Sequence, residues 1–495
     1  MADSSGHWLS HSREPDSRAV PDLGRLLREY RAAERLTQEQ LASRLVVSQS
    51  YVSRIEAGRR VPLHVEFLRA VSELLGIPPA QLGLASGQPA PPGSRPPGGA
   101  RVPDLVAASQ DEWRTVRRYL NQHRCDLARE AAHLYDAATR LPDTPLLALP
   151  GWRPGEPVLL DHIELTMTDG PHPCGVDGSE PESWQVRPLR APGQRYERYT
   201  SAVRYLDPPT LFENRPSYRL LDVGWAQGTG SMRFGLGNYF DKLDVSEAAG
   251  HEMAAASLDR TIGSTGVPGV EARSALPFRA LVGDPFDLTR RAVIPAITTL
   301  TLRRRHTHGT ASFLLHWRDP AKVATASGLY DVIPAGEFQP SSMAPWDREN
   351  DFDLWRNVVR ELSEELLGTP EHDGSRSTPI DYAAWPLFRN LGQAREERKL
   401  SVYCLGVAID ALTLAATIMT VLVIDDDAFD AIFGDVVHVN AEGVTVAAGP
   451  GRRAADGLPF TEATVTRLLR SEPMASPGAG CLALAWRHRV QLLGA

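Results

Sequence analysis

Three glutamates between positions 361 and 365 have the types and the spacing that suit a divalent cation. Residues 360–368 read Arg-Glu-Leu-Ser-Glu-Glu-Leu-Leu-Gly, so Glu361, Glu364 and Glu365 follow an i, i+3, i+4 pattern. On a helix, this spacing brings the three carboxylates close together. They repel one another unless a cation or Arg360 compensates, and carboxylate oxygens are ligands that Mg²⁺ prefers. The pattern predicts that these glutamates hold Mg²⁺ if the helix is catalytic.

A second set of polar residues, near position 50, has the types that read DNA. Thr37-Gln38-Glu39-Gln40 is a capping box, which begins a helix. A second short helix is expected from about Gln49 to a cap at Gly58, with Val52 and Ile55 facing inward. Four polar residues then face outward, namely Gln49, Ser50, Ser53 and Arg54. Gln and Arg make bidentate contacts to base edges in the major groove, so the second helix is predicted to enter that groove.

Residues 23–84 as a whole resemble the Cro/C1 or XRE-type helix-turn-helix domain. The matching words are Leu-Thr-Gln-Glu-Gln-Leu-Ala from Leu36 and Ser-Gln-Ser-Tyr-Val-Ser-Arg-Ile-Glu-Ala-Gly-Arg-Arg from Ser48. The resemblance implies that double-stranded DNA is the partner and that bases are read by Gln49, Ser50 and Arg54. It also implies that phosphates are held by Gln38, Arg59 and Arg60. One position departs from the family, because Val46 stands where the turn usually has Gly.

The acidic segment resembles the signature of Nudix domains, which bind or hydrolyse nucleoside diphosphates linked to another group. Val332-Ile333-Pro334-Ala335-Gly336 precedes it, as the family's strand and glycine do. The resemblance implies an α/β (α+β) domain with a mixed sheet and, in an active enzyme, Mg²⁺. Three features depart from the pattern. The loop after Gly336 is about ten residues longer, Phe352 stands where the family has Glu, and Gly368 comes one position late. Asp351, Asp353 or Glu349 are the available substitutes for that Glu.

Composition excludes several classes of protein. The chain has 495 residues, of which 42% are hydrophobic and 23% charged, and it contains no apolar run that suits a membrane-spanning helix. Residues 1–20 are polar, which predicts disorder and no signal peptide. The four cysteines have no CxxC spacing, which argues against a zinc site and against a disulfide framework. Free cysteines of this kind fit the reducing cytoplasm.

The distribution of charge and a Pro- and Gly-rich segment divide the chain into regions. Residues 22–84 contain nine Arg against seven Asp or Glu, whereas the whole chain has a net charge of −8, so a slightly positive head joins an acidic remainder. The predicted organisation is a disordered N-terminus at 1–20, an all-α helix-turn-helix head at 21–85, a Pro/Gly-rich linker at 86–104, a connecting helix at 105–141, a strand-rich middle region at 142–293 and a Nudix-like domain at 294–495. The connecting helix is expected to pack either on the distal domain or on a second subunit.

Two further segments carry weaker signals. Residues 220–230 place an acidic residue and three glycines after an apolar run, as a methyltransferase motif does, but the following residues alternate like a strand. A glycine-bearing β-hairpin is therefore expected there. Residues 303–308 read Arg-Arg-Arg-His-Thr-His, which suits either an anionic ligand or, more commonly, a solvated strand end.

These features predict a cytoplasmic, dimeric transcription regulator without membrane contact. Its Nudix-like domain is expected to sense a nucleotide-derived ligand or to serve as an interaction scaffold. The alternative is a Mg²⁺-dependent Nudix pyrophosphohydrolase fused to a DNA-binding head. A third hypothesis is a regulator whose distal domain binds only protein.

Overall fold

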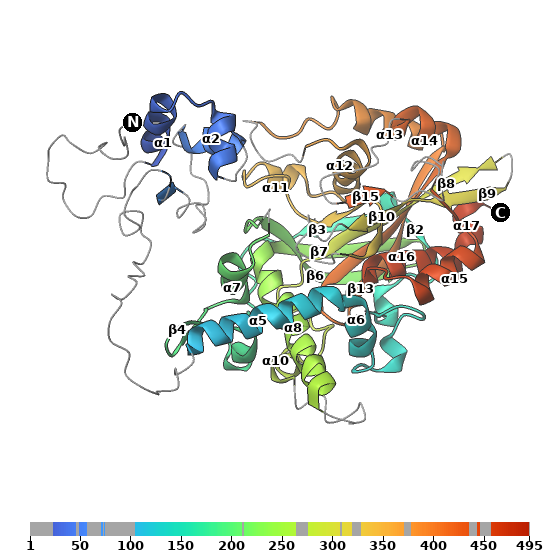
Figure 1. Cartoon of the computed structure of the whole chain (residues 1–495). Helices are drawn as coiled ribbons and strands as arrows, with labels where there is room; N and C mark the ends of the chain where they lie inside the picture. The colour runs from blue at the N-terminus through green and yellow to red at the C-terminus, as the bar shows by residue number, and fades with distance from the viewer. Residues whose placement is uncertain are drawn as a thin grey trace, which may run out of the picture. The chain divides into compact units, whose positions relative to one another are not determined.

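The computed structural model describes residues 23–45, 49–56, 71–72, 74, 104–209, 212–263, 276–306, 309–318, 328–370, 378–434, 443–445 and 457–494 (Figure 1). The chain divides into two compact units, Met1–Arg101 and Val102–Ala495, which we call the head and the body. The segment predicted to be disordered, residues 1–20, lies outside the described residues. So does the predicted linker apart from Asp104.

The head contains three described helices, α1 (Leu23–Ala33), α2 (Gln38–Leu45) and α3 (Gln49–Glu56). The predicted capping box is confirmed, because the Thr37 hydroxyl accepts from the Gln40 N–H at 3.2 Å and the Gln40 side chain accepts from the Thr37 N–H at 2.9 Å. The helices enclose a small apolar cluster of Leu27, Leu41, Ala42, Leu45, Val52, Ile55 and Val71. Val52 and Ile55 thus face inward as predicted.

The body is built on a mixed sheet with the strand order β1-β13-β14-β8-β9-β16; in addition, β12 pairs with β8 and β2 pairs with β13. The long strands are β8 (Ala296–Arg305), β13 (Leu400–Asp410) and β14 (Ala416–Asp425). The short ones are β1 (Leu146–Leu147), β2 (Val158–Leu159), β9 (Thr310–Phe313), β12 (Ala335–Glu337) and β16 (Leu458–Pro459). In this sheet, β14 and β8 run parallel and the other pairs are antiparallel.

Helices cover both faces of this sheet. Side chains alternate between the faces of a strand, and on β14 Ile418, Leu422 and Ile424 belong to one apolar cluster, whereas Met419, Val421 and Val423 belong to the other. The first cluster includes α12 (Leu354–Leu367), α13 (Pro386–Glu396) and α14 (Asp426–Phe433). The second includes α15 (Glu462–Ser471) and α16 (Ser476–Arg487). The predicted α/β region with a mixed sheet is confirmed.

The middle region and the C-terminal region share one body. Leu146 of β1 pairs with Asp410 of β13, and Val158 of β2 pairs with Cys404. A separate three-stranded sheet contains β3 (Ile163–Met167), β7 (Thr229–Asn238) and β6 (Pro216–Ala226). β6 and β7 form the predicted hairpin, with Gly228 at φ +74° in its two-residue turn. Small sheets also join β4 (Leu189–Ala191) with β5 (Gln194–Arg195), and β11 (Tyr330–Val332) with β10 (Leu315–Arg318) and β15 (Gly443–Thr445).

The remaining helices pack around the first cluster. They are α5 (Leu105–Gln122), α6 (Arg124–Ala132), α7 (Tyr199–Leu206), α8 (Tyr239–Gly263), α10 (Pro277–Val282) and α11 (Asp347–Asn350), while α17 (Arg489–Leu493) follows α16. The predicted connecting helix is thus two helices, separated at His123. The break places Arg124 against Glu247 of α8, with a bidentate contact at 3.1 and 3.0 Å. α5 buries Trp113, Val116 and Leu120 in the body, where it packs against α8 and β4 of the predicted middle region.

Candidate functional sites

A buried ion pair joins the first and third helices of the head. Arg31 Nε and Nη2 donate to the two carboxylate oxygens of Glu56 at 2.8 and 2.9 Å, and Gln38 Nε2 donates to Glu56 at 2.9 Å. The Glu56 side chain is only 4% exposed and that of Arg31 is 28% exposed. This contact fixes α3 relative to α1 and to the first turn of α2. The sequence reasoning assigned no role to Arg31 or Glu56, because nothing in the local pattern links residues 25 positions apart.

The residues predicted to read bases lie on α3. The structure describes the backbone of this helix from Gln49 to Glu56. The side chains of Gln49, Ser50 and Arg54 lie outside the described part, as do Arg59 and Arg60 entirely. Gln38 is described, and its amide lies on Glu56. Because Gln38 is the first residue of α2, it stands where N–H groups lack intrahelical acceptors and favour an anion.

The acidic segment of the body forms α12 as predicted. The Asp353 side chain caps its first turn by accepting from the Arg356 N–H at 2.8 Å. Gly368 ends it with φ +65°, a left-handed conformation that glycine adopts without steric cost. The cap explains why this glycine falls one position later than the family pattern: it is placed by the end of the helix.

Two of the three glutamates of α12 pack against β12. Glu365 is 5% exposed and its Oε1 accepts from the Ala335 N–H at 3.0 Å. The Glu361 carboxyl group lies directly over Gly336, where an added Cβ would be 2.0 Å from the carboxyl carbon. Gly336 is therefore needed for close approach of strand and helix. Glu364 is partly exposed. Here the carboxylates contribute to the packing between α12 and β12.

Arg360 and the position eight before it also have structural partners. Arg360 is buried, with Nη1 3.4 Å from Asp351 Oδ2 and Nη2 donating to the Gln339 carbonyl at 2.8 Å. Asp351 also accepts from the Tyr382 hydroxyl at 2.7 Å. Phe352 joins an aromatic cluster, with its ring 5.0 Å from Tyr218 and 5.9 Å from Phe338. Of the candidate substitutes for the family's Glu, Asp351 thus faces Arg360, whereas Asp353 caps the helix.

The residues of α12 do not fit a bound Mg²⁺. A hard cation needs several oxygen ligands converging on one point. Glu365 uses an oxygen on the Ala335 N–H, and Glu361 packs on Gly336. Among the residues that the structure describes, no group of three or more His, Cys, Asp or Glu side chains is arranged to hold a metal ion.

The basic run at the end of β8 is paired with aspartates. Arg303 is 2% exposed, and its guanidinium contacts Asp426 at 2.5 Å and Asp430 at 2.9 Å, over the ring of Phe429. Arg304 and His306 both contact Asp425, at 2.8 and 2.9 Å. The partners come from the end of β14 and the start of α14, which run beside β8. These ion pairs connect β8 to β14 and α14, so the charges of the arginines are already compensated within the fold.

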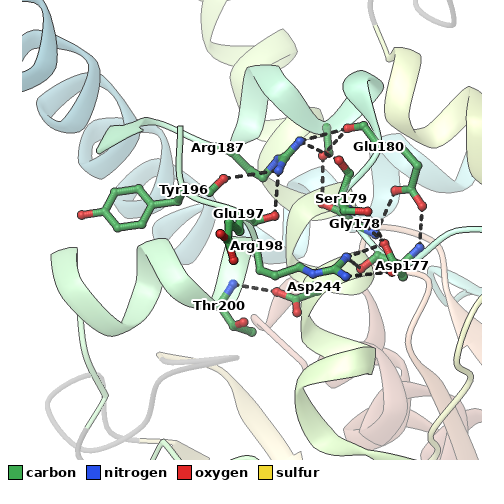
Figure 2. A network of polar contacts seen from close by, with 11 residues as sticks. Asp177, Gly178, Ser179, Glu180, Arg187, Tyr196, Glu197, Arg198, Thr200 and Asp244 are labelled. Atoms are coloured by element: carbon green, nitrogen blue, oxygen red, sulfur yellow. Dashed lines mark hydrogen bonds and ion pairs between the residues drawn. The ribbon is translucent and has the colours of Figure 1, made fainter. Parts of the chain in front are cut away.

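A second polar network in the body holds the loop from Asp177 to Arg187 (Figure 2). Arg198 forks onto both carboxylate oxygens of Asp177, and Glu180 accepts from the backbone N–H groups of Asp177 and Gly178 at 2.7 and 2.9 Å. Arg187 donates only to backbone carbonyls, among them that of Glu197 at 2.7 Å. Most of these groups bond to one another or to the backbone, although the Nε of Arg187 is buried without a hydrogen bond, and the network holds the loop in place.

Asp244 and Glu252 of α8 each cap another helix. Asp244 accepts from the Thr200 N–H of α7 at 2.7 Å, and Glu252 accepts from the Phe278 and Arg279 N–H groups of α10 at 2.7 and 2.9 Å. Burial raises the pKa of Asp244 to about 6 and that of Glu252 to about 7, despite these hydrogen bonds. Both carboxyl groups lie in the interior and stabilise the contacts of α8 with α7 and α10.

Comparison with known proteins identifies the head. Residues 22–84 match a family model described as a helix-turn-helix domain. A search of curated proteins found no match for the chain. Within the described residues, no helix is long and apolar enough to cross a membrane. The match covers the three helices, the capping box and the Arg31–Glu56 pair, so residues 22–84 form a helix-turn-helix head, joined to an α/β body with a mixed sheet.

Proposed function

We propose that this protein is a sequence-specific, DNA-binding transcription regulator of the XRE type. The observation that carries the proposal is the α2–α3 arrangement. A capped helix is followed by a short helix, whose Glu56 pairs with Arg31 of α1. In such a motif the second helix enters the major groove and the first crosses the backbone. Gln49, Ser50 and Arg54 of α3 then read bases. Gln38, at the start of α2, and Arg59 and Arg60 contact phosphates.

The protein acts as a dimer in this proposal. The head carries a net charge of only about +2, from nine Arg and seven acidic residues in positions 22–84. Because phosphate neutralisation supplies most non-specific affinity, one head binds weakly. Two heads reading half-sites one helical turn apart, ~34 Å, overcome this weakness.

Base reading is tested by selecting preferred sites from random DNA and measuring gel shifts. Arg54→Ala should reduce discrimination at one base by roughly 5- to 150-fold, the equivalent of about 1–3 kcal/mol for a bidentate contact. Arg25→Ala is the matched control, because Arg25 is 60% exposed on α1 and pairs with Glu29. Unchanged specificity in Arg54→Ala would overturn the assignment. Moving the half-sites apart by half a helical turn should abolish cooperative binding if the dimer is correct.

We propose further that the body is Nudix-like in fold and regulates without catalysis. Support comes from the mixed sheet, from Gly336 facing α12, and from the packing of Glu361 and Glu365 against β12. A ligand regulates DNA binding only if it has different affinities for two arrangements of the protein. Incubation with ADP-ribose and NAD separates the hypotheses. Turnover that is lost in Glu365→Gln favours the hydrolase, thermal stabilisation without turnover favours the sensor, and neither effect favours a protein-binding scaffold.

A further inference from the structure

A short, exposed hairpin, formed by β4 and β5, lies beside the first helix of the body. The two strands are joined by Pro192 and Gly193, and Gly193 has φ +72°. Proline fixes the backbone at the first turn position and glycine adopts the left-handed second one, so the turn has little conformational freedom. The register shifts between Leu189 and Ala191. Arg190 is thus the extra residue of a β-bulge, a feature that re-aims a side chain, and it is exposed.

Side chains of α5 hold this hairpin in place. The Ser109 hydroxyl accepts from the Leu189 N–H at 3.1 Å, and the Gln110 amide donates to the Leu189 carbonyl at 2.9 Å. Figure 1 accordingly shows β4 beside the first turns of α5. On the second strand, the Arg195 guanidinium donates to the Arg187 carbonyl at 2.6 Å, which sets the direction of its side chain.

The hairpin concentrates positive charge on an acidic body. Residues 187–206 contain five Arg and one Glu, although the whole chain has a net charge of −8. In the part of the chain that the structure describes, no carboxylate lies within 4.0 Å of the guanidinium groups of Arg187, Arg190 or Arg195. Arg187 is buried, whereas Arg190 and Arg195 are exposed. These two arginines therefore carry their charge to the surface without an ion-pair partner among the described residues.

An exposed aromatic ring lies at the base of the hairpin. Tyr205, near the end of α7, is 71% exposed, and its ring stacks on that of Tyr196 with the centroids 6.0 Å apart. Tyr196 is buried and directly follows Arg195. Arginine and tyrosine side chains both donate to the phosphate oxygens of DNA, and the arginine fork matches a phosphate bidentately. The surface thus has the residue types that contact a DNA backbone.

A solvated surface loop is the ordinary explanation for exposed arginines. Such a loop, however, needs neither a Pro-Gly turn nor a bulge nor two contacts from a neighbouring helix. Here these features hold the backbone of Arg190 and Arg195 in place. Because the positions are fixed beforehand, binding costs less conformational entropy. A partner with fixed, repeated anionic groups suits this surface, and the phosphates of a DNA duplex are of that kind.

The place of the hairpin in the chain favours DNA over an acidic protein. α5, on which the hairpin packs, follows its N-cap Asp104 and is the first described element after the head. DNA held by the head is therefore linked covalently to the helix that carries the hairpin. Such a link raises the effective concentration of a second contact, so that weak phosphate contacts add to the affinity. An acidic protein has no such link to this part of the chain.

We propose that the β4–β5 hairpin is a second DNA contact, in which Arg190 and Arg195, with Tyr205 beside them, bind phosphates of the duplex that the head reads. The proposal rests on the proposed function of the head. Because phosphate contacts carry no sequence information directly, the hairpin adds affinity and salt dependence but no base preference. It also offsets the small charge of the head, about +2 from nine Arg and seven acidic residues.

The test uses the full chain and fluorescence anisotropy titrations with a duplex of unrelated sequence, between about 50 and 200 mM salt. In Arg190→Gln/Arg195→Gln the slope of log affinity against log salt should fall by about 0.9 for each residue, with a loss of roughly five-fold for each near 0.15 M salt. Arg190→Lys/Arg195→Lys should keep the slope, because it keeps both charges. Since Arg195→Gln also removes the bond to the Arg187 carbonyl, Arg190→Gln is measured alone as well.

The matched control is Arg389→Gln/Arg398→Gln, which removes two exposed charges from α13 and the residues after it. Figure 1 places α13 away from β4. This control should bind like the wild type. Equal melting temperatures of the wild type and both double variants show that the fold is intact.

Separate outcomes decide the hairpin and the head. Site selection from random DNA tests the head: Arg54→Ala loses base preference, whereas the double hairpin variant keeps that preference and loses affinity equally on all duplexes. If the wild type selects no site, the proposed function of the head fails, and the unrelated duplex still tests the hairpin. An unchanged salt slope in the hairpin variant, or an equal loss in the control, overturns the hairpin proposal. So does a loss of binding to polyglutamate with DNA binding unchanged, which would indicate an acidic protein partner.

Discussion

Replacing Arg31 by Met should destabilise the head, because it removes the contact that fixes α3 relative to α1. The change keeps the aliphatic stem of Arg31 but removes both hydrogen bonds to Glu56, at 2.8 and 2.9 Å. The Glu56 carboxylate, 4% exposed, is then left with Gln38 among the contacts described above. Removing one partner of a fully buried ion pair costs about 3–5 kcal/mol. Because the Arg31 side chain is 28% exposed, solvent screens part of this energy. We therefore expect about 2–3 kcal/mol.

Hydrogen exchange on the full chain measures this effect in place. A loss of about 2–3 kcal/mol raises the opening equilibrium of α1, α2 and α3 by roughly 30- to 150-fold, and the amide exchange rates rise equally. Peptides from the body serve as the internal reference. Arg25→Met is the matched variant, since the Arg25–Glu29 pair is about 60% exposed on both sides and contributes at most about 0.5 kcal/mol. Equal exchange in Arg31→Met and wild type would refute the reasoning.

The same pair makes the head sensitive to acid. Burial alone would raise the pKa of Glu56, but hydrogen bonds from Arg31 and Gln38 outweigh it and the pKa is lowered. A carboxyl group with a lowered folded-state pKa stabilises the fold above its unfolded pKa, ~4.5, and loses that contribution as the pH falls through the folded value. The protection factors of α1–α3, which are the exchange rates relative to those of an unfolded chain at the same pH, should therefore fall below about pH 4.5 in the wild type. In Arg31→Met this loss should be smaller or absent, because burial then raises the pKa of Glu56 with less opposition and protonation no longer destabilises the fold.

Two further predictions concern the body. Because the folded-state pKa of Glu252 is raised to about 7, its contribution to stability is present at acid pH and is lost as the pH rises through 7. The unfolding free energy of the wild type minus that of Glu252→Gln should therefore fall by up to about 3 kcal/mol between pH 4 and pH 8. Denaturant titrations measure this difference, and a difference that does not depend on pH would contradict the assignment. Glu365→Ala leaves the Ala335 N–H without its acceptor and should lower the free energy of unfolding by about 1–3 kcal/mol with or without Mg²⁺. Glu364→Ala, at a partly exposed position, should lower it by less. A destabilisation that appears only when Mg²⁺ is present would indicate a metal ligand instead.

Features set by neighbouring residues were predictable from the sequence. The Thr37–Gln40 capping box needs only three residues of separation, and the inward positions of Val52 and Ile55 follow from helical spacing. The β6–β7 hairpin was predictable because glycine at position 228 and alternation on both sides are local signals. In each case the physical cause lies within one or two turns of chain.

Features set by distant residues were not predictable. The Arg303 guanidinium is neutralised by Asp426 and Asp430, which are 123 and 127 positions away, so the basic run read alone suggested a free charge. Strands β1 and β2 have two residues each, too few to show a period, yet they tie the middle region to β13. Gly406 of β13 packs directly against the backbone of Trp152 and Arg153, and no local pattern brings these residues together.

The pairing of β1 with β13 also sets the order in which a growing chain can mature. The apolar cluster formed by the described residues of the head spans Leu27 to Val71, so its contacts are available once that short segment has been synthesised. The body must wait, because Leu146 pairs with Asp410 and Thr298 of β8 pairs with Met419. Long-range pairing of this kind closes late and leaves strand edges open meanwhile. A ribosome-bound or truncated chain that ends before β13 therefore carries its helix-turn-helix head before the main sheet of the body can close.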